Sequence, residues 1–176
     1  MIRHKPCIHS FPPIAAPDAT LLILGSMPSK ASLLANQYYA HPRNAFWPIM
    51  GALFGAGPEA PYARRVRVLK QAGVAVWDVL ASCTRGSSLD SDIDERSIVP
   101  NDFASFFRAH PRIERVFFNG AKAEASFRRH VLPRLAVAAL RFERLPSTSP
   151  ANASWSHARK LRAWRIVGAG WCGTSG

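Results

Sequence analysis

The residues best suited to chemistry gather in one short stretch, YYAHPRNAFWPIM at positions 38–50. It combines four aromatic side chains with His41, Arg43 and Asn44. A buried strand would not carry three hydrogen-bonding side chains and an internal proline, and a surface loop rarely contains four aromatic rings. The stretch therefore indicates a site that needs stacking surface and fixed polar groups side by side.

A second candidate lies where the apolar run LLILG ends, in GSMPS at positions 25–29. A strand that stops at Gly25 and turns through Pro28 leaves backbone N–H groups, including those of Ser26 and Met27, pointing away from the sheet. Such groups bind an oxyanion or a carbonyl oxygen. The spacing of a phosphate-binding P-loop is absent. A plain strand-to-helix turn is the other interpretation.

A third candidate is LPSTSPANASW at positions 145–155. Ser149 followed by Pro150 has the form of an N-cap and a first helical residue. Ser147, Thr148 and the free N–H groups would then hold a phosphate at a helix N-terminus. Basic residues follow within three turns: Arg159, Lys160 and Arg162. The alternative is a well-capped helix with a solvated basic face.

Asp78 stands inside the apolar run VAVWDVL at positions 74–80. A lone buried carboxylate is costly, so this side chain either caps a neighbouring loop or accepts hydrogen bonds from a ligand. The histidines are scattered and have no serine or carboxylate partner at a motif spacing. The sequence therefore gives no support for a hydrolytic triad.

Composition favours a compact soluble protein with a polyanionic partner. The 176 residues fit one domain, with 48% hydrophobic and 19% charged residues. Lys and Arg number 23 against 11 Asp and Glu, a formal net charge of +12. Such an excess suits nucleic acid, because each neutralised phosphate releases counterions. Simple solubility by net charge is the alternative.

Several classes of protein are excluded. The three cysteines, Cys7, Cys83 and Cys172, have no metal-ligand spacing and are odd in number, so we expect no metal site and no disulfide framework. A flavodoxin-like nucleotide or cofactor binder would need a glycine-rich fingerprint that the chain lacks, and we expect no cofactor. Without a signal segment or a long apolar run, we expect a reduced, cytoplasmic protein that does not bind membranes.

The elements that must position these residues alternate along the chain. Short apolar runs predict strands at 21–25, 74–80, 115–120 and 138–146, and amphipathic patterns predict helices at 61–72, 101–110, 120–131 and 156–166. We expect one domain over 1–176, with an extended leader at 1–19 and a polar loop at 81–99. Alternating strands and helices form a parallel sheet, and ligands bind at the carboxyl ends of its strands.

The combination of GSMPS, YYAHPRNAFW and STSPA resembles the uracil-DNA glycosylase superfamily, and most of all its hypoxanthine-DNA (deoxyinosine) glycosylase branch. The resemblance runs from about SFPPIA to AWRIV, nearly the whole chain. It implies a three-layer αβα sandwich around a four-stranded parallel sheet. It also implies a metal-free, monomeric enzyme that flips a deaminated base out of DNA and hydrolyses its N-glycosidic bond.

The same resemblance implies roles for individual residues. Tyr39 would stack on the flipped base, Asp78 would read its edge, and the backbone of Gly25, Ser26, Met27 and Pro28 would contact it. Met27 stands where many members of the superfamily carry a polar residue, and Asn44 would hold the attacking water instead. Contacts to the DNA would come from Arg43, Ser147, Thr148, Ser149, Asn152 and Lys160. The segment after the second motif offers no large aliphatic wedge for the base stack.

The substrate that follows is hypoxanthine in DNA, with uracil and xanthine as further bases, in double-stranded DNA or in single strands. Two alternatives stay open. The first is a uracil- or mismatch-specific glycosylase with little activity on hypoxanthine. The second is a DNA-binding relative without activity, against which the presence of both Tyr39 and Asn44 argues.

Overall fold

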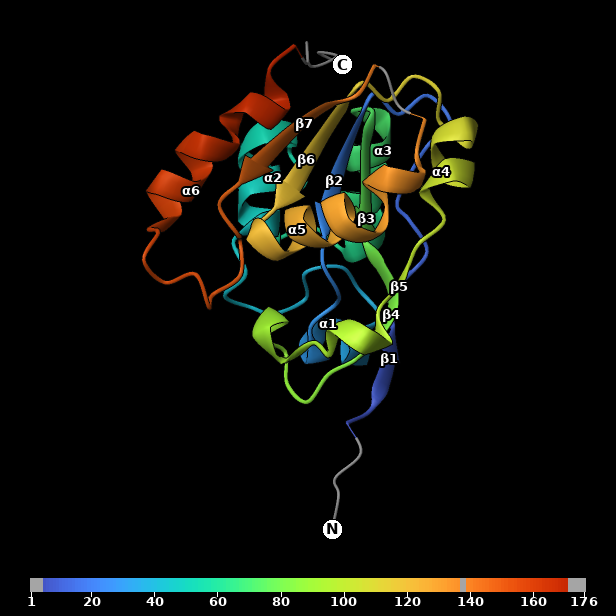
Figure 1. Cartoon of the computed structure of the whole chain (residues 1–176). Helices are drawn as coiled ribbons and strands as arrows, with labels where there is room; N and C mark the ends of the chain where they lie inside the picture. Colours follow the sequence, from blue (N-terminus) through green and yellow to red (C-terminus); the bar gives the residue numbers. More distant parts are fainter. Residues whose placement is uncertain (1–4, 137–138, 171–176) are drawn as a thin grey trace.

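A central parallel sheet carries the fold in the computed structural model, which describes residues 5–136 and 139–170 (Figure 1). Its strands are β2 (Leu21–Gly25), β3 (Val74–Asp78), β6 (Arg115–Asn119) and β7 (Arg141–Leu145), in the order β3-β2-β6-β7. All four predicted strands are confirmed: β2 has the predicted bounds, and the other three are shorter. Position 138 of the last prediction lies outside the described residues.

Burial explains why these runs form strands. Every residue of β2 and β3 is buried, as expected for strands covered on both faces, whereas the edge strand β7 exposes Arg141, Glu143 and Arg144. In register, Gly25 pairs with Asp78 across β2 and β3. The strand order changes direction beside β2, and such a switch point is where open α/β sheets bind ligands.

Helices cover both faces of the sheet, so the predicted αβα sandwich is confirmed. In Figure 1, α2 (Phe46–Phe54) and α3 (Tyr62–Gln71) lie behind the strands, and α5 (Ala121–His130) lies in front. The other helices are α1 (Lys30–Ala35), α4 (Phe103–Ala109) and α6 (His157–Trp164). The predicted helices correspond to α3, α4, α5 and α6, while α1 and α2 were not predicted. Short 3-10 turns η3 (Leu132–Arg134) and η4 (Arg165–Gly168) follow α5 and α6.

A second, antiparallel sheet was not expected from the sequence. It joins β1 (Cys7–His9), β4 (Leu80–Thr84) and β5 (Val99–Pro100) in the order β1-β4-β5. The described part of the leader, from residue 5, is therefore extended but adds a strand to the fold. The predicted polar loop at 81–99 contains most of β4 and two 3-10 turns, η1 (Asp90–Asp92) and η2 (Glu95–Ser97).

The expected helix start at Ser149 is wrong. Residues 149–155 form turns, in which the Ser149 hydroxyl accepts a hydrogen bond from the Ala151 N–H at 3.2 Å. Helix α6 begins at His157, with Ser156 as its N-cap. A phosphate site at the N-terminus of a helix capped by Ser149 is therefore not formed.

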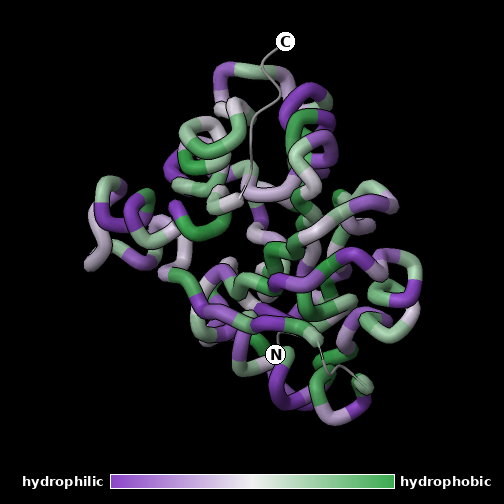
Figure 2. Tube along the Cα trace, turned by 90° about the horizontal axis from the view of Figure 1, so that it is seen from above, coloured by the Kyte–Doolittle hydropathy of each residue, from purple (hydrophilic) through white to green (hydrophobic). Residues whose placement is uncertain are grey.

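The core follows from the amphipathic pattern of the outer elements. Hydrophilic and hydrophobic positions alternate along several coiled segments of the tube in Figure 2, and the apolar side chains of the helices pack on the buried strands. Cys7 and Cys83 carry free thiols, and Cys172 lies outside the described residues. No helix in the described ranges has the length and apolar character needed to cross a bilayer.

Candidate active site

One cavity of about 920 Å³ opens at the carboxyl ends of the parallel strands, where the sequence placed the site. All four strand ends contribute to its wall. The predicted residues that line it are Gly25, Ser26, Met27, Pro28, Tyr39, Asn44, Asp78, Ser147, Thr148, Ser149 and Asn152. Arg43 and Lys160 line an adjoining cavity of about 280 Å³ that shares Asn44 and Asn152 with the first.

Gly25 allows two polar side chains to converge at the floor of the cavity. A Cβ atom at this position would lie 2.6 Å from Oδ1 of Asp78 and 2.9 Å from Oη of Tyr39. Any side chain there would collide with both. The glycine that ends β2 thus leaves the space in which a carboxyl group and a phenol meet.

Tyr39 combines a constrained backbone with a buried hydroxyl. Its φ of 54° lies in the left-handed region, and its ring stacks on Phe46 with centroids 4.0 Å apart and planes inclined by 23°. The hydroxyl is buried without a hydrogen-bond partner. Burial raises the pKa of Tyr39 above its usual range, and Asp78 adds to the shift. The group is therefore a neutral O–H, held ready to donate.

Asp78 is a buried carboxyl group with one free oxygen. The residue is 3% exposed, and its Oδ2 has no hydrogen-bond partner. Burial raises the pKa of Asp78 from 3.8 to about 7; Asp90 adds to the shift and Arg85 opposes it. Near neutral pH this carboxyl group can accept or donate a proton in a hydrogen bond.

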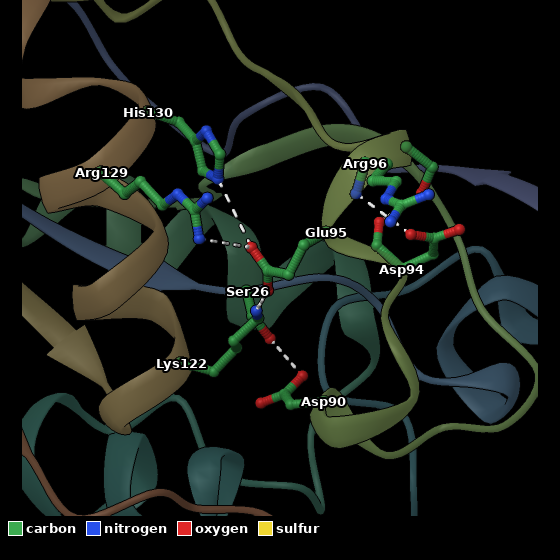
Figure 3. A network of polar contacts seen from close by, with 9 residues as sticks. Ser26, Asp90, Asp94, Glu95, Arg96, Lys122, Arg129 and His130 are labelled. Carbon is green, nitrogen blue, oxygen red and sulfur yellow. Dashed lines mark hydrogen bonds and ion pairs between the residues drawn. The ribbon is translucent and has the colours of Figure 1, made fainter.

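Asp90 and Arg85 join the site from the segment that the sequence indicated as a polar loop. The Ser26 hydroxyl donates to Oδ1 of Asp90 at 2.6 Å (Figure 3). Burial of this carboxyl group raises the pKa of Asp90, although much of the residue's surface is exposed. Arg85 is 2% exposed and donates to the Pro28 carbonyl, so it helps to fix the turn after β2.

Asn44 lies two residues before α2, and its carboxamide oxygen makes one hydrogen bond. Its Oδ1 accepts a hydrogen bond from the Phe46 N–H at 2.9 Å, which fixes the side chain. A carbonyl oxygen has two lone pairs, so one is left to accept a hydrogen bond from water. The next residue, Ala45, donates its N–H to the Thr148 carbonyl at 3.0 Å and ties this segment to the loop after β7.

The loop after β7 is held by buried polar groups. Nδ2 of Asn119 donates to Oγ1 of Thr148, and Oδ1 of Asn119 accepts from the Thr148 N–H, both at 2.9 Å. Thr148 is 0% exposed and Lys160 is 5% exposed, with the Lys160 ammonium bonded to the Ser149 carbonyl at 3.1 Å. In the free protein Thr148 and Lys160 therefore hold this loop in place.

Three residues of the site were missed from the sequence. Asn119 ends β6 in the motif FFNG and lines the cavity, and its position at a strand end was the available signal. Asp90 and Arg85 gave no local signal, because only the path of the chain between β4 and β5 brings them to the turn after β2.

Comparisons with known proteins show the family of the chain. A profile of the family described as "Uracil DNA glycosylase superfamily" matches residues 12–167. A protein of Methanosarcina acetivorans named "Hypoxanthine DNA glycosylase" is 33% identical over 158 residues, which are 89% of this chain and 95% of the relative. A protein of Methanosarcina barkeri with the same name is 34% identical over 114 residues, 64% of this chain and 71% of the relative.

A solved structure has the same fold. The solution NMR structure of a candidate uracil DNA glycosylase from Methanosarcina acetivorans superposes with a TM-score of 0.73 at 29% identity. The match covers 92% of this chain and 99% of that one. With a family match over most of its length and the site at the expected strand ends, the chain belongs to the uracil-DNA glycosylase superfamily.

Proposed function

We propose that this protein is a DNA glycosylase that removes deaminated bases, hypoxanthine first, by hydrolysis of the N-glycosidic bond. The observation that carries the proposal is the single cavity in which Asn44, Tyr39 and Asp78 meet. Two relatives whose names state hypoxanthine DNA glycosylase activity support the choice of base. The protein would act as a monomer in the cytoplasm, on double-stranded DNA.

The floor of the cavity suits a flipped base. Phe46 covers one face of the Tyr39 ring, and we assign the opposite face to the base. The free Oδ2 of Asp78 would accept the N1–H of hypoxanthine when the carboxyl group is ionised. Oδ2 of Asp78 lacks a partner in the free protein, so a base that bonds to it replaces one unsatisfied group with a hydrogen bond. The Tyr39 hydroxyl lies in the plane of its ring, so it would not bond to the base that stacks on that ring.

Bond cleavage would depend on position and electrostatics. Oδ1 of Asn44 would orient a water molecule toward C1′ of the deoxyribose, while its bond to the Phe46 N–H keeps the amide in place. An amide does not titrate near neutral pH, so Asn44 is not a general base. The bond would break largely dissociatively, and DNA phosphates would stabilise the cationic sugar.

DNA would approach along the face that holds both cavities. Arg43 is exposed beside Asn44, and Ser147, Ser149 and Asn152 are half-buried at the mouth of the larger cavity. These residues would contact phosphates around the extruded nucleotide. The net charge of +12 supplies the long-range attraction.

The proposal is tested with otherwise identical duplexes that carry hypoxanthine, uracil, xanthine or only normal bases. We expect abasic sites, detected as alkali-labile breaks, with hypoxanthine released fastest. The reaction should be unaffected by EDTA, since no cluster of three His, Cys, Asp or Glu side chains stands within the described ranges to hold a metal. Faster release of uracil would favour the uracil-specific alternative, and release of no base would favour the inactive relative.

A further inference from the structure

One exposed leucine stands at the rim of the cavity. Four large hydrophobic side chains are exposed among the residues that the structure describes: Leu34, Leu89, Val99 and Ile166. Of these, Leu89 lines the cavity, with 49% of its surface exposed. Its neighbours in the sequence, SSLDSD, are polar. Single exposed apolar side chains are common on proteins, so what distinguishes Leu89 is its place at the cavity.

The backbone of Leu89 is fixed on both sides. Its N–H donates to the Ser87 hydroxyl at 3.0 Å, and its carbonyl accepts from the Asp92 N–H at 3.1 Å. The residues next to it are anchored to the turn after β2. Asp90 accepts from Ser26 at 2.6 Å, and Ser88 accepts from the Lys30 N–H at 2.9 Å. The leucine therefore projects from a turn that is already ordered in the free protein.

The base of the same segment is tied to α5. Glu95 pairs with Lys122, and its Oε2 lies 3.7 Å from both Arg129 and His130 (Figure 3). Asp94 donates its N–H to the Thr84 carbonyl at 2.9 Å. Both ends of the segment are anchored in the free protein. The segment can therefore keep Leu89 in place against stacked bases without first becoming ordered.

The segment after β7 offers no comparable side chain. Ala151 and Ala153 are exposed but small, and Asn152 is occupied in a bond to the Ser147 carbonyl at 3.1 Å. Trp155 also lines the cavity, but it is half-buried and the Arg159 guanidinium lies 4.3 Å from its ring centroid. Leu89 is thus the aliphatic side chain at this rim that is both large and free.

We propose that Leu89 is the apolar wedge that enters the base stack of DNA when the target nucleotide rotates into the cavity. The inference rests on the proposed glycosylase function. Extruding a base leaves a gap between its neighbours, and inserted aliphatic side chains fill such gaps in DNA-distorting proteins. Because the turn that carries Leu89 is bonded to Ser26, the wedge and the cavity floor would move as one body.

The first test compares duplex and single-stranded substrates. Leu89→Ala should slow single-turnover release of hypoxanthine from a duplex by about tenfold, because the gap is no longer filled. Release from a single strand should change less than about twofold, since no stack has to be opened. Val99→Ala is the control, because Val99 is 53% exposed and lies away from the cavity lining. Equal losses on both substrates, or a duplex rate like that of the parent, would overturn the proposal.

A second test does not depend on catalysis. A fluorescent 2-aminopurine is placed beside 2′-fluoro-deoxyinosine, whose glycosidic bond resists hydrolysis, in a duplex. The parent should brighten the reporter as the stack opens, and Leu89→Ala should lose most of this signal while still binding the duplex. If Trp155→Ala loses the signal and Leu89→Ala keeps it, the wedge is Trp155. If the parent protein brightens the reporter but releases no hypoxanthine from the cleavable duplex, the proposed function is contradicted and the proposal that Leu89 is the wedge still holds.

Discussion

Two buried oxygen atoms of the cavity, Oη of Tyr39 and Oδ2 of Asp78, have no hydrogen-bond partner. Each unsatisfied buried polar group costs about 1–3 kcal/mol of stability. At Asp78 this loss is recovered when a base supplies the missing partner, so the carboxyl group links the free energy of unfolding of the free protein to its affinity for a base. The Tyr39 hydroxyl lies in the plane of the stacking ring, so its cost bears on stability alone.

Tyr39→Phe removes the unsatisfied hydroxyl and keeps the ring. We expect the free protein to be more stable in urea by up to about 1 kcal/mol, while single-turnover release of hypoxanthine changes little, because the stacking face of the ring is kept. Tyr39→Ala should weaken binding of an uncleavable substrate by about 1–3 kcal/mol, the usual size of a base–aromatic stack. If Tyr39→Phe slows release as much as Tyr39→Ala, stacking is the wrong role and a contact through the hydroxyl must replace it.

Asp78 predicts an unusual dependence of stability on pH. Its pKa is raised to about 7 in the folded protein from 3.8, so between these values the folded state binds more protons than the unfolded state. The free energy of unfolding should therefore fall as pH rises from about 4 to about 7. Asp78→Asn should reduce this slope. Part of the slope should remain in the variant, because the pKa of Asp90 is also raised. Urea unfolding of both proteins at several pH values measures the difference, and identical slopes would show that Asp78 ionises normally.

At the scale of elements, continuous apolar runs identified the strands, and some local signals misled. Helix α2 contains Phe46, Trp47, Ile49, Met50 and Phe54, all buried, so it shows no polar face by which a helix is recognised. Pro48 occupies the first turn of this helix, where a missing N–H is tolerated. The small sheet was missed because β1 and β4 pair over a long stretch of sequence, which local periodicity does not report.

Thr148 holds the loop after β7 to Asn119 at the end of β6, and two substitutions test that role. Thr148→Val keeps the shape but removes the acceptor for Nδ2 of Asn119, so we expect the free energy of unfolding to fall by about 1–3 kcal/mol. Thr148→Ser keeps the hydroxyl and should cost less. Affinity for undamaged DNA should stay the same in both variants, because Thr148 is 0% exposed. A loss of affinity in Thr148→Val without a loss of stability would instead support the contact between Thr148 and DNA that the sequence analysis expects.

At the scale of the molecule, the motifs identified the site better than they identified its surroundings. Gly25 and Asp78 end neighbouring strands, as the apolar runs predict, whereas Tyr39 and Asn44 were expected at the site from the resemblance to the superfamily. Asp90 and Leu89 reach the same cavity through the segment between β4 and β5, whose path depends on contacts with Ser26 and Lys30. Such long-range contacts leave no periodic pattern in the sequence.

The net charge of +12 predicts that affinity for undamaged duplex DNA depends strongly on salt. About four to six phosphate contacts give a slope of roughly −4 to −5 in a plot of log affinity against log salt concentration. Titrations at a series of NaCl concentrations measure it. A flat response would mean that the excess of basic residues serves solubility and does not contact phosphates.

The central claim is that Asn44 positions the attacking water, and single-turnover release of hypoxanthine by Asn44→Ala tests it most directly. We predict that the rate falls by about 10²-fold or more, the scale of losing one positioned polar group, with little change in affinity for an uncleavable duplex. The substitution also removes the bond to the Phe46 N–H, so Asn44→Asp, which keeps an acceptor there, is the control for folding and should retain partial activity. Release of hypoxanthine by Asn44→Ala at the parent rate would contradict the mechanism.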